Sequence, residues 1–292
     1  MTSSVIAARL PAAPVLGYPV AASSAVLSAL SRPCAGSVLG VVPYAVYVGL
    51  DDPEATVLTV STCDGTRLPN ALMLACPSTD RPFARHRWGQ RAAITPAGLM
   101  VGCVTYRPVR WWTPRHLRGS WDVELLPRNA AALAERLDLV PPLSADVAVP
   151  AAELAAALAD GDAGRLRQAG DRLLGLGGGS TPAGDDLLAG VLVVVAQLGR
   201  ALPAERLRHL FGRLGEHLVA AGPGRTTALS ASLLRHAAAG RAADPVVGVV
   251  EALAGRQALD PALDALLRLG STSGADTARG LLLGARSLLA TS

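Results

Sequence analysis

The chain has 292 residues, of which 50% are hydrophobic, 17% are charged and 3% are aromatic, and its formal net charge is +4. This length predicts a sizeable core and two domains, and the composition disfavours intrinsic disorder. The small net charge, spread along the chain, disfavours dedicated nucleic-acid binding. Every basic side chain other than histidine is an arginine, which excludes a lysine base or a lysine Schiff base from the chemistry.

The sequence predicts no membrane segment. The longest apolar run, Leu187 to Leu198, is too short to cross a bilayer, and Pro11 and Pro14 interrupt any signal-like N-terminal segment. We therefore expect a cytoplasmic protein. The cysteines lack metal-ligand spacing, so buried free thiols are expected at Cys34, Cys63, Cys76 and Cys103.

The first part of the chain is predicted to be rich in β-strands. Short apolar or β-branched stretches alternate with turn-forming residues and have no helix between them, which is typical of a small barrel or sandwich. The expected strands are 38–48, 55–60, 71–76, 99–106 and, as a further candidate, 121–126.

From about residue 129 the pattern changes to Ala, Leu and Arg with helical periodicity. The expected helices are 129–138, 151–174, 184–199, 203–220, 226–239, 245–255, 261–269 and 274–290. We therefore predict an α+β protein with a β-rich domain, a barrel or sandwich, at 1–127 and an all-helical domain at 128–292. Prolines mark residues 139–149 as the expected linker, and Asp244 and Asp260, each before a proline, are expected helix N-caps.

Two glycine-rich turns are the most informative feature. Residues 175–190 are Gly-Leu-Gly-Gly-Gly-Ser-Thr-Pro-Ala-Gly-Asp-Asp-Leu-Leu-Ala-Gly, and residues 270–280 are Gly-Ser-Thr-Ser-Gly-Ala-Asp-Thr-Ala-Arg-Gly. Each turn opens an apolar helical run, and the unpaired N–H groups at a helix start favour an anion. We expect the two helices to pack together with adjacent N-termini, so that the turns form one composite site. The structural alternative is a tight helix entry with Ser180 or Thr181 as its N-cap.

The acidic residues of the turns are the candidate catalytic groups. Asp185 and Asp186 are adjacent, so their side chains point about 100° apart on a helix, and only one is expected to face a ligand. Alignment of the two turns matches Asp186 with Asp276. These two carboxylates are therefore the better candidates to bind substrate N–H groups or a Mg²⁺ ion.

A third glycine turn precedes another helix. It is Gly-Pro-Gly-Arg-Thr-Thr at 222–227, with Ser230 one turn later. Arg225 suits bidentate recognition of a carboxylate or phosphate, and a surface arginine beside a capping threonine is an equally good interpretation. In the segment 107–121, arginines interleave with tryptophans, which favours a domain or subunit contact.

Together, the two glycine turns and the Arg-Thr-Thr-x-x-x-Ser run resemble the AllH-type subunit of oxamate carbamoyltransferase. The resemblance covers the C-terminal half well. In the first half it is limited to residues 65–69 and 112–114. It implies a role in purine or allantoin nitrogen catabolism, in which a carbamoyl group is exchanged between oxalurate and phosphate, giving oxamate and carbamoyl phosphate. It also implies larger partner subunits, so this chain would hold only part of the active site.

The resemblance also implies roles for individual residues. The glycine turn and Arg225 would bind phosphate or the oxamate carboxylate, while Asp186 and Asp276 would position N–H groups or Mg²⁺. The expected catalytic residues are therefore Asp186, Asp276 and Arg225. The Ser-Thr-Arg-Thr loop of aspartate-type transcarbamoylases is missing, so the mechanism would differ from theirs. The expected substrate-binding residues are Gly177, Gly178, Gly179, Ser180, Thr181, Gly184, Asp185, Thr226, Thr227, Ser230, Ser271, Thr272, Ser273 and Gly274.

Two other functions stay open at the level of sequence. The run Gly-Ala-Asp-Thr at 274–277 is similar to part of the Asp-Thr-Asp-Thr element of ADP-ribosylglycohydrolases, which are Mg²⁺-dependent hydrolases, although the second Asp is missing. The other alternative is a noncatalytic assembly subunit whose glycine turns dock a partner loop.

Overall fold

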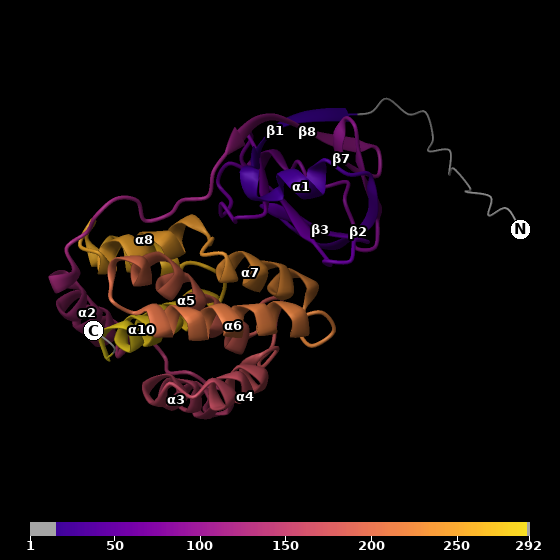
Figure 1. The fold of residues 1–292 in the computed structure, drawn as a ribbon. Coiled ribbons are helices and arrows are strands. Elements are labelled where there is room, and N and C mark those ends of the chain that lie inside the picture. The colour runs from indigo at the N-terminus through magenta and orange to yellow at the C-terminus, as the bar shows by residue number, and fades with distance from the viewer. Residues whose placement is uncertain (1–15, 291–292) are drawn as a thin grey trace, which may run out of the picture.

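The computed structural model describes residues 16–290; Pro11 and Pro14 lie outside this range. It contains a closed β-barrel followed by a helical region, and residues 113–122 connect the two (Figure 1). The predicted α+β arrangement is confirmed. The linker expected at 139–149 is wrong, because those residues lie within the helical region and include the start of a helix.

Eight strands close the barrel in the order β1-β5-β4-β3-β2-β6-β7-β8, with β1 and β8 parallel at the closure. Apolar side chains from these strands fill its interior, around the fully buried Tyr106. The strands are β1 (Leu16–Ser23), β2 (Cys34–Val42), β3 (Ala45–Leu50), β4 (Val57–Ser61), β5 (Ala71–Leu74), β6 (Arg91–Thr95), β7 (Gly98–Val101) and β8 (Val104–Trp112). A short helix, α1 (Leu27–Leu30), follows β1.

The helical region begins where a strand was expected. Residues 121–126 form a 3-10 turn, Val123–Leu125, that leads into α2, because Asp122 accepts a hydrogen bond from the N–H of Glu124 and Pro127 favours a helix start. The helices are α2 (Leu126–Leu137), α3 (Ala145–Asp160), α4 (Ala163–Leu173), α5 (Ala183–Leu198), α6 (Glu205–Ala221), α7 (Ala228–Ala238), α8 (Asp244–Leu253), α9 (Leu259–Leu267) and α10 (Ser273–Ala290).

Two local predictions about the helices are wrong. The expected helix 151–174 is two helices, because Gly161 adopts a positive φ of 66° and Asp162 caps a new helix through the N–H groups of Gly164 and Arg165. Asp244 and Asp260 lie in the first turns of α8 and α9 rather than at their N-caps. There they still complement the positive end of the helix dipole.

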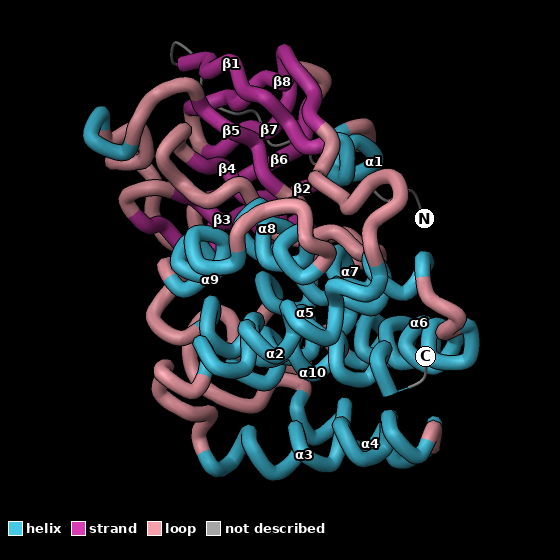
Figure 2. Tube along the Cα trace, turned by 90° about the vertical axis from the view of Figure 1, so that its left-hand side faces the viewer, coloured by secondary structure: helices cyan, strands magenta, loops and turns pink. Residues whose placement is uncertain are grey.

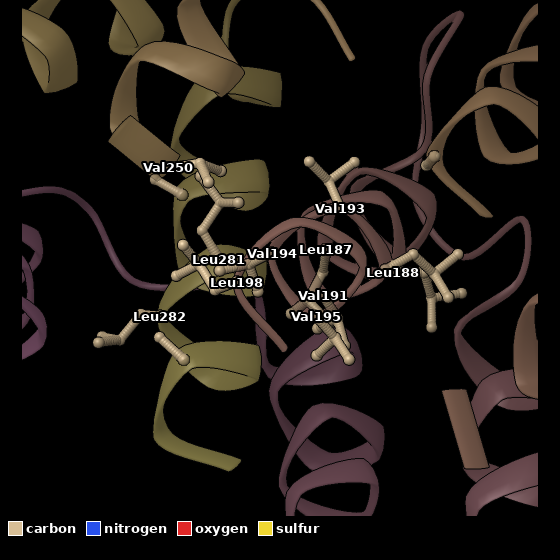
Figure 3. Packing of buried hydrophobic residues seen from close by; sticks show 14 of the residues in the cluster. Leu187, Leu188, Val191, Val193, Val194, Val195, Leu198, Val250, Leu281 and Leu282 are labelled. Carbon is tan, nitrogen blue, oxygen red and sulfur yellow. The ribbon is translucent and has the colours of Figure 1, made fainter. Parts of the chain in front are cut away.

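The apolar helices α5 and α10 form the centre of the helical region, as expected. Side chains surround α5 on nearly every side, and Leu281 and Leu282 of α10 pack beside it (Figure 3). The backbones approach very closely: a Cβ added to Gly280 would lie 2.0 Å from the carbonyl oxygen of Leu187. Only glycine therefore permits this crossing of the two helices.

The barrel rests on α7 and α8, which lie between it and the central helices (Figures 1 and 2). The Ser232 hydroxyl accepts a hydrogen bond from the N–H of Val57, at 3.4 Å, and Arg235 donates to the Glu54 carbonyl. The helices α3 and α4 form an outer layer on the side away from the barrel (Figure 2).

The Arg/Trp segment contributes to the same junction. Arg115 pairs with Glu251 of α8. Trp112 lies 5.2 Å from the guanidinium of Arg67, a barrel residue that itself pairs with Asp244 of α8 at 3.7 Å. These contacts support the predicted domain-contact role of the segment.

The four cysteines are free, but Cys63 and Cys103 are exposed and the other two are half-buried. The expectation of buried thiols is therefore wrong. Within residues 16–290, no helix has the length and hydropathy that a membrane crossing requires.

Candidate functional site

The two glycine turns converge in space. The Thr181 and Ser273 hydroxyl oxygens lie 2.8 Å apart and share a hydrogen bond across the starts of α5 and α10. This confirms that the two N-termini are adjacent. Thr181 does not cap α5, whose N-cap residue is Pro182 and has no side-chain hydrogen bond, so the helix-entry interpretation does not account for this hydroxyl.

A cavity of about 230 Å³ lies beside these turns, between the barrel and the helical region. The turns contribute Ser180, Thr181, Asp186, Gly270 and Ser273 to its wall, and α10 adds Thr277. The barrel side contributes Tyr44, Ala45, Tyr47, Ser61, Thr66, Leu68 and Pro69. The remaining lining comes from α5, α7, the connection between α7 and α8, α8 itself and the connection between α9 and α10, through Ala189, Val193, Leu229, Leu233, Ala237, Arg241, Ala242, Ala243, Val246 and Leu269.

Asp186 is the acidic side chain of this wall. Its Oδ2 atom is buried and has no hydrogen-bond partner within the described residues. Burial raises the pKa of Asp186 to about 8, with the nearby Asp276 and Asp185 carboxylates acting in the same direction and the Ser273 and Thr181 hydroxyls opposing them. The carboxyl therefore holds its proton at neutral pH and presents a hydrogen-bond donor to the cavity.

The Asp185 side chain points away from the cavity. This agrees with the angle of about 100° expected between the Asp185 and Asp186 side chains on a helix. The Asp185 Oδ1 accepts the N–H of Gly175 at 2.8 Å, and its Oδ2 accepts the hydroxyls of Ser230, at 2.6 Å, and Thr226. The carboxylate thus ties the first glycine turn to the start of α7. All of this favours a structural role over the predicted substrate-binding role for Asp185, Thr226 and Ser230.

Arg225 does not line the cavity. Its Nη1 lies 2.6 Å from Asp171 Oδ1 and its Nη2 donates to the Asp171 carbonyl, also at 2.6 Å. Thr227 caps α7 by accepting the N–H of Ser230. This is the arrangement of the alternative interpretation, a surface arginine beside a capping threonine.

Asp276 lies close to Asp186 but is not part of the cavity wall. It is buried, and Arg279 Nη1 lies 4.0 Å from its Oδ1. Burial raises its pKa, while the Thr272 hydrogen bond and the Arg279 charge oppose that rise. Residues 16–290 contain no cluster of three or more His, Cys, Asp or Glu side chains placed to hold a metal ion.

The remaining predicted residues surround the cavity without lining it. Gly177, Gly178 and Gly179 are exposed beside Ser180, and Ser271 and Thr272 are exposed before α10. Gly184 and Gly274 have packing roles. A Cβ on Gly184 would lie 2.1 Å from the Leu173 carbonyl oxygen, and a Cβ on Gly274 would lie 2.0 Å from the Leu266 carbonyl oxygen. The glycine that the two motifs share therefore lets a helix start against another helix.

Arg241 supplies the guanidinium of the cavity wall and was not among the residues predicted from the sequence. Its Nε atom is buried without a hydrogen-bond partner among the described residues, and burial lowers its pKa. It follows Gly240 between α7 and α8. The same Gly-Arg pair occurs at 224–225 and 255–256, so the local sequence does not distinguish it.

Residues 173–285 match the family model described as oxamate carbamoyltransferase subunit AllH. The resemblance inferred from the glycine turns is confirmed for this part of the chain. The matched segment begins in α4, ends in α10 and contains both glycine turns, Asp186 and Arg241. No solved structure matches the chain.

Proposed function

We propose that this chain is a subunit of an oxamate carbamoyltransferase-like complex and that the cavity binds part of its small substrate. One observation carries the proposal: within the segment that matches the family, a buried carboxyl with one unpartnered oxygen and four hydroxyls meet in a cavity. Polar groups that converge in a concave site are typical of ligand binding.

The reaction needs a proton at the position where a bond to nitrogen breaks. A phosphate oxygen attacks the carbamoyl carbon of oxalurate, the C–N bond to the oxamate nitrogen breaks, and that nitrogen takes up a proton. Asp186, with a pKa of about 8, is suited to donate this proton at neutral pH and to regain one from the incoming phosphate. The exchange yields oxamate and carbamoyl phosphate.

The Mg²⁺ expectation fits these residues less well. Asp186 and Asp276 would both have to be ionised to bind the ion, and burial disfavours the ionised form of each. A Mg²⁺ ion held by one or two carboxylates takes its other ligands from water and phosphate. If the ion binds this pair, Mg²⁺ will raise the melting temperature of the wild-type chain but not of Asp276→Asn.

The test is the activity of the complex purified with its partner subunits. Carbamoyl phosphate formation from oxalurate and phosphate is measured for wild type, Asp186→Asn and the exposed control Asp138→Asn. We expect Asp186→Asn to lose about 10²-fold or more, the scale of general acid catalysis, and the control to keep its activity. Size-exclusion chromatography establishes that each complex is intact.

An unchanged rate in Asp186→Asn would instead support the noncatalytic assembly role. Hydrolysis of ADP-ribose linkages with tight Mg²⁺ binding would support the hydrolase alternative.

A further inference from the structure

A hydrogen-bonded turn at the end of α7 positions Arg241 at the cavity. The helix α7 ends at Ala238, and Gly240 adopts a positive φ of 71°. The N–H of Arg241 then donates a hydrogen bond to the His236 carbonyl at 2.8 Å. Gln197 of α5 fixes the same turn, because its Nε2 donates to the Gly240 carbonyl at 2.8 Å. The backbone of Arg241 is therefore held from two helices.

The guanidinium at this position lacks a counterion. Arg241 forms no ion pair within the described part of the chain, whereas Arg225 is paired with Asp171. The other groups that feel its charge are His116 and His236, whose pKa values are lowered first by burial and then by the Arg241 charge. A partly buried cation with an orphan Nε is costly unless an anion binds it.

The cavity wall also provides hydrogen-bonding groups for the uncharged part of a ligand. Asp186 and the hydroxyls of Thr181 and Ser273 offer hydrogen bonds on the side of the glycine turns. The volume of about 230 Å³ is below the roughly 300–1,000 Å³ of pockets for drug-sized ligands, so a small molecule fits. The site is thus suited to a compact molecule with an anionic end and a hydrogen-bonding end.

We propose that Arg241 binds the carboxylate of a small amide-bearing substrate in this cavity, while Asp186 and the neighbouring hydroxyls bind its amide. A planar guanidinium matches a carboxylate with two parallel hydrogen bonds. The choice of an amide-bearing carboxylate rests on the proposed function, but the assignment of Arg241 as the carboxylate-binding residue does not. The barrel therefore forms one wall of the substrate site rather than a separate module.

The experiment measures binding to the full chain by isothermal titration calorimetry, with oxamate, pyruvate, malonate and inorganic phosphate as probes. The variants are Arg241→Gln, Arg241→Lys and the matched control Arg225→Gln, whose guanidinium lies outside the cavity. Circular dichroism establishes that each variant is folded. We expect Arg241→Gln to weaken oxamate binding at least tenfold, Arg241→Lys to weaken it less, and Arg225→Gln to match wild type.

A second measurement distinguishes a role of Arg241 in carboxylate binding from a role in phosphate binding. In the active complex, Arg241→Gln should raise KM for oxalurate without a comparable change in KM for phosphate. A rise confined to phosphate would overturn the proposal, and so would carboxylate binding that is insensitive to Arg241.

Failure of the proposed function has a different signature. If oxamate does not bind but pyruvate or malonate binds in an Arg241-dependent way, the assignment of Arg241 stands and the proposed function fails. If oxamate binds equally well to wild type and Arg241→Gln, the proposed function survives and the assignment fails. Absence of binding by every carboxylate, in both the chain and the complex, refutes the assignment.

Discussion

Substitution of Asp186 by asparagine should make the stability of the protein less sensitive to pH. A carboxyl whose pKa is raised by folding holds its proton more tightly in the folded protein than in the unfolded chain. Its contribution to stability is fully present below the unfolded pKa of 3.8 and is lost as the pH rises towards the folded pKa of about 8. Asparagine resembles the protonated carboxyl in shape but does not titrate.

The expected magnitude follows from the position of this pH window. Each pH unit inside it costs about 1.4 kcal/mol of stability. Between pH 5 and pH 7 the wild-type chain should therefore lose about 3 kcal/mol that Asp186→Asn retains. For a domain of this size, that difference is roughly 6–12 °C in melting temperature.

The assay is thermal and urea unfolding of both proteins at pH 5, 6, 7 and 8, in a buffer that contains a chelator to remove Mg²⁺. Asp138→Asn is the control, because this side chain is exposed and should leave the wild-type profile unchanged. Parallel profiles for wild type and Asp186→Asn would show that Asp186 is ionised in the folded protein, and the reasoning would be refuted.

Three further substitutions test the structural roles. Asp185→Ala removes the acceptor of three hydrogen bonds and should cost about 3 kcal/mol or more in urea unfolding; a loss below 1 kcal/mol would contradict its role as a tie. Gly280→Ala should destabilise the chain strongly by forcing α5 and α10 apart, while Gly212→Ala, in an open part of α6, should be neutral or stabilise it by up to about 1 kcal/mol. Arg225→Ala removes an exposed ion pair and should cost about 1 kcal/mol or less, with little effect on activity; a large loss of activity with the complex intact would restore its predicted part in catalysis.

The fold was predictable wherever one pattern dominated. Helical periodicity located each main helix of the C-terminal region, and the absence of a polar face on α5 correctly indicated a central helix. The strand β6 was missed although it forms a local hairpin with β7, because its Arg-Ala-Ala-Ile-Thr sequence contains alanines of low β-propensity. The strand β1 was missed because it pairs in parallel with β8, over 80 residues away in sequence. Local sequence carries little information about such pairing.

Two wrong predictions about secondary structure arise from capping residues that are visible in the sequence. The break between α3 and α4 is marked by Gly161 and the capping Asp162, but the alanine-rich flanks conceal it. The segment Trp-Asp-Val-Glu-Leu-Leu alternates like a strand, and the helix start is decided by Asp122 and Pro127 instead. In both places, capping chemistry outweighs hydrophobic periodicity.

The position of Arg241 in the candidate site could not be predicted from the local sequence. Gly-Arg pairs at 224–225, 240–241 and 255–256 follow helices, and the glycine of each of these three pairs adopts a positive φ. The arginines then meet different surroundings: Arg225 pairs with Asp171, Arg256 donates to the Ser120 carbonyl, and Arg241 faces the cavity. The backbone conformation at the glycines is similar, so the difference comes from the packing of the barrel against α7 and α8. This packing places the Arg241 guanidinium, which has no counterion among the described residues, in the cavity wall. The feature that points to an anionic ligand therefore arises from the junction of the two parts of the chain, and no window of sequence contains it.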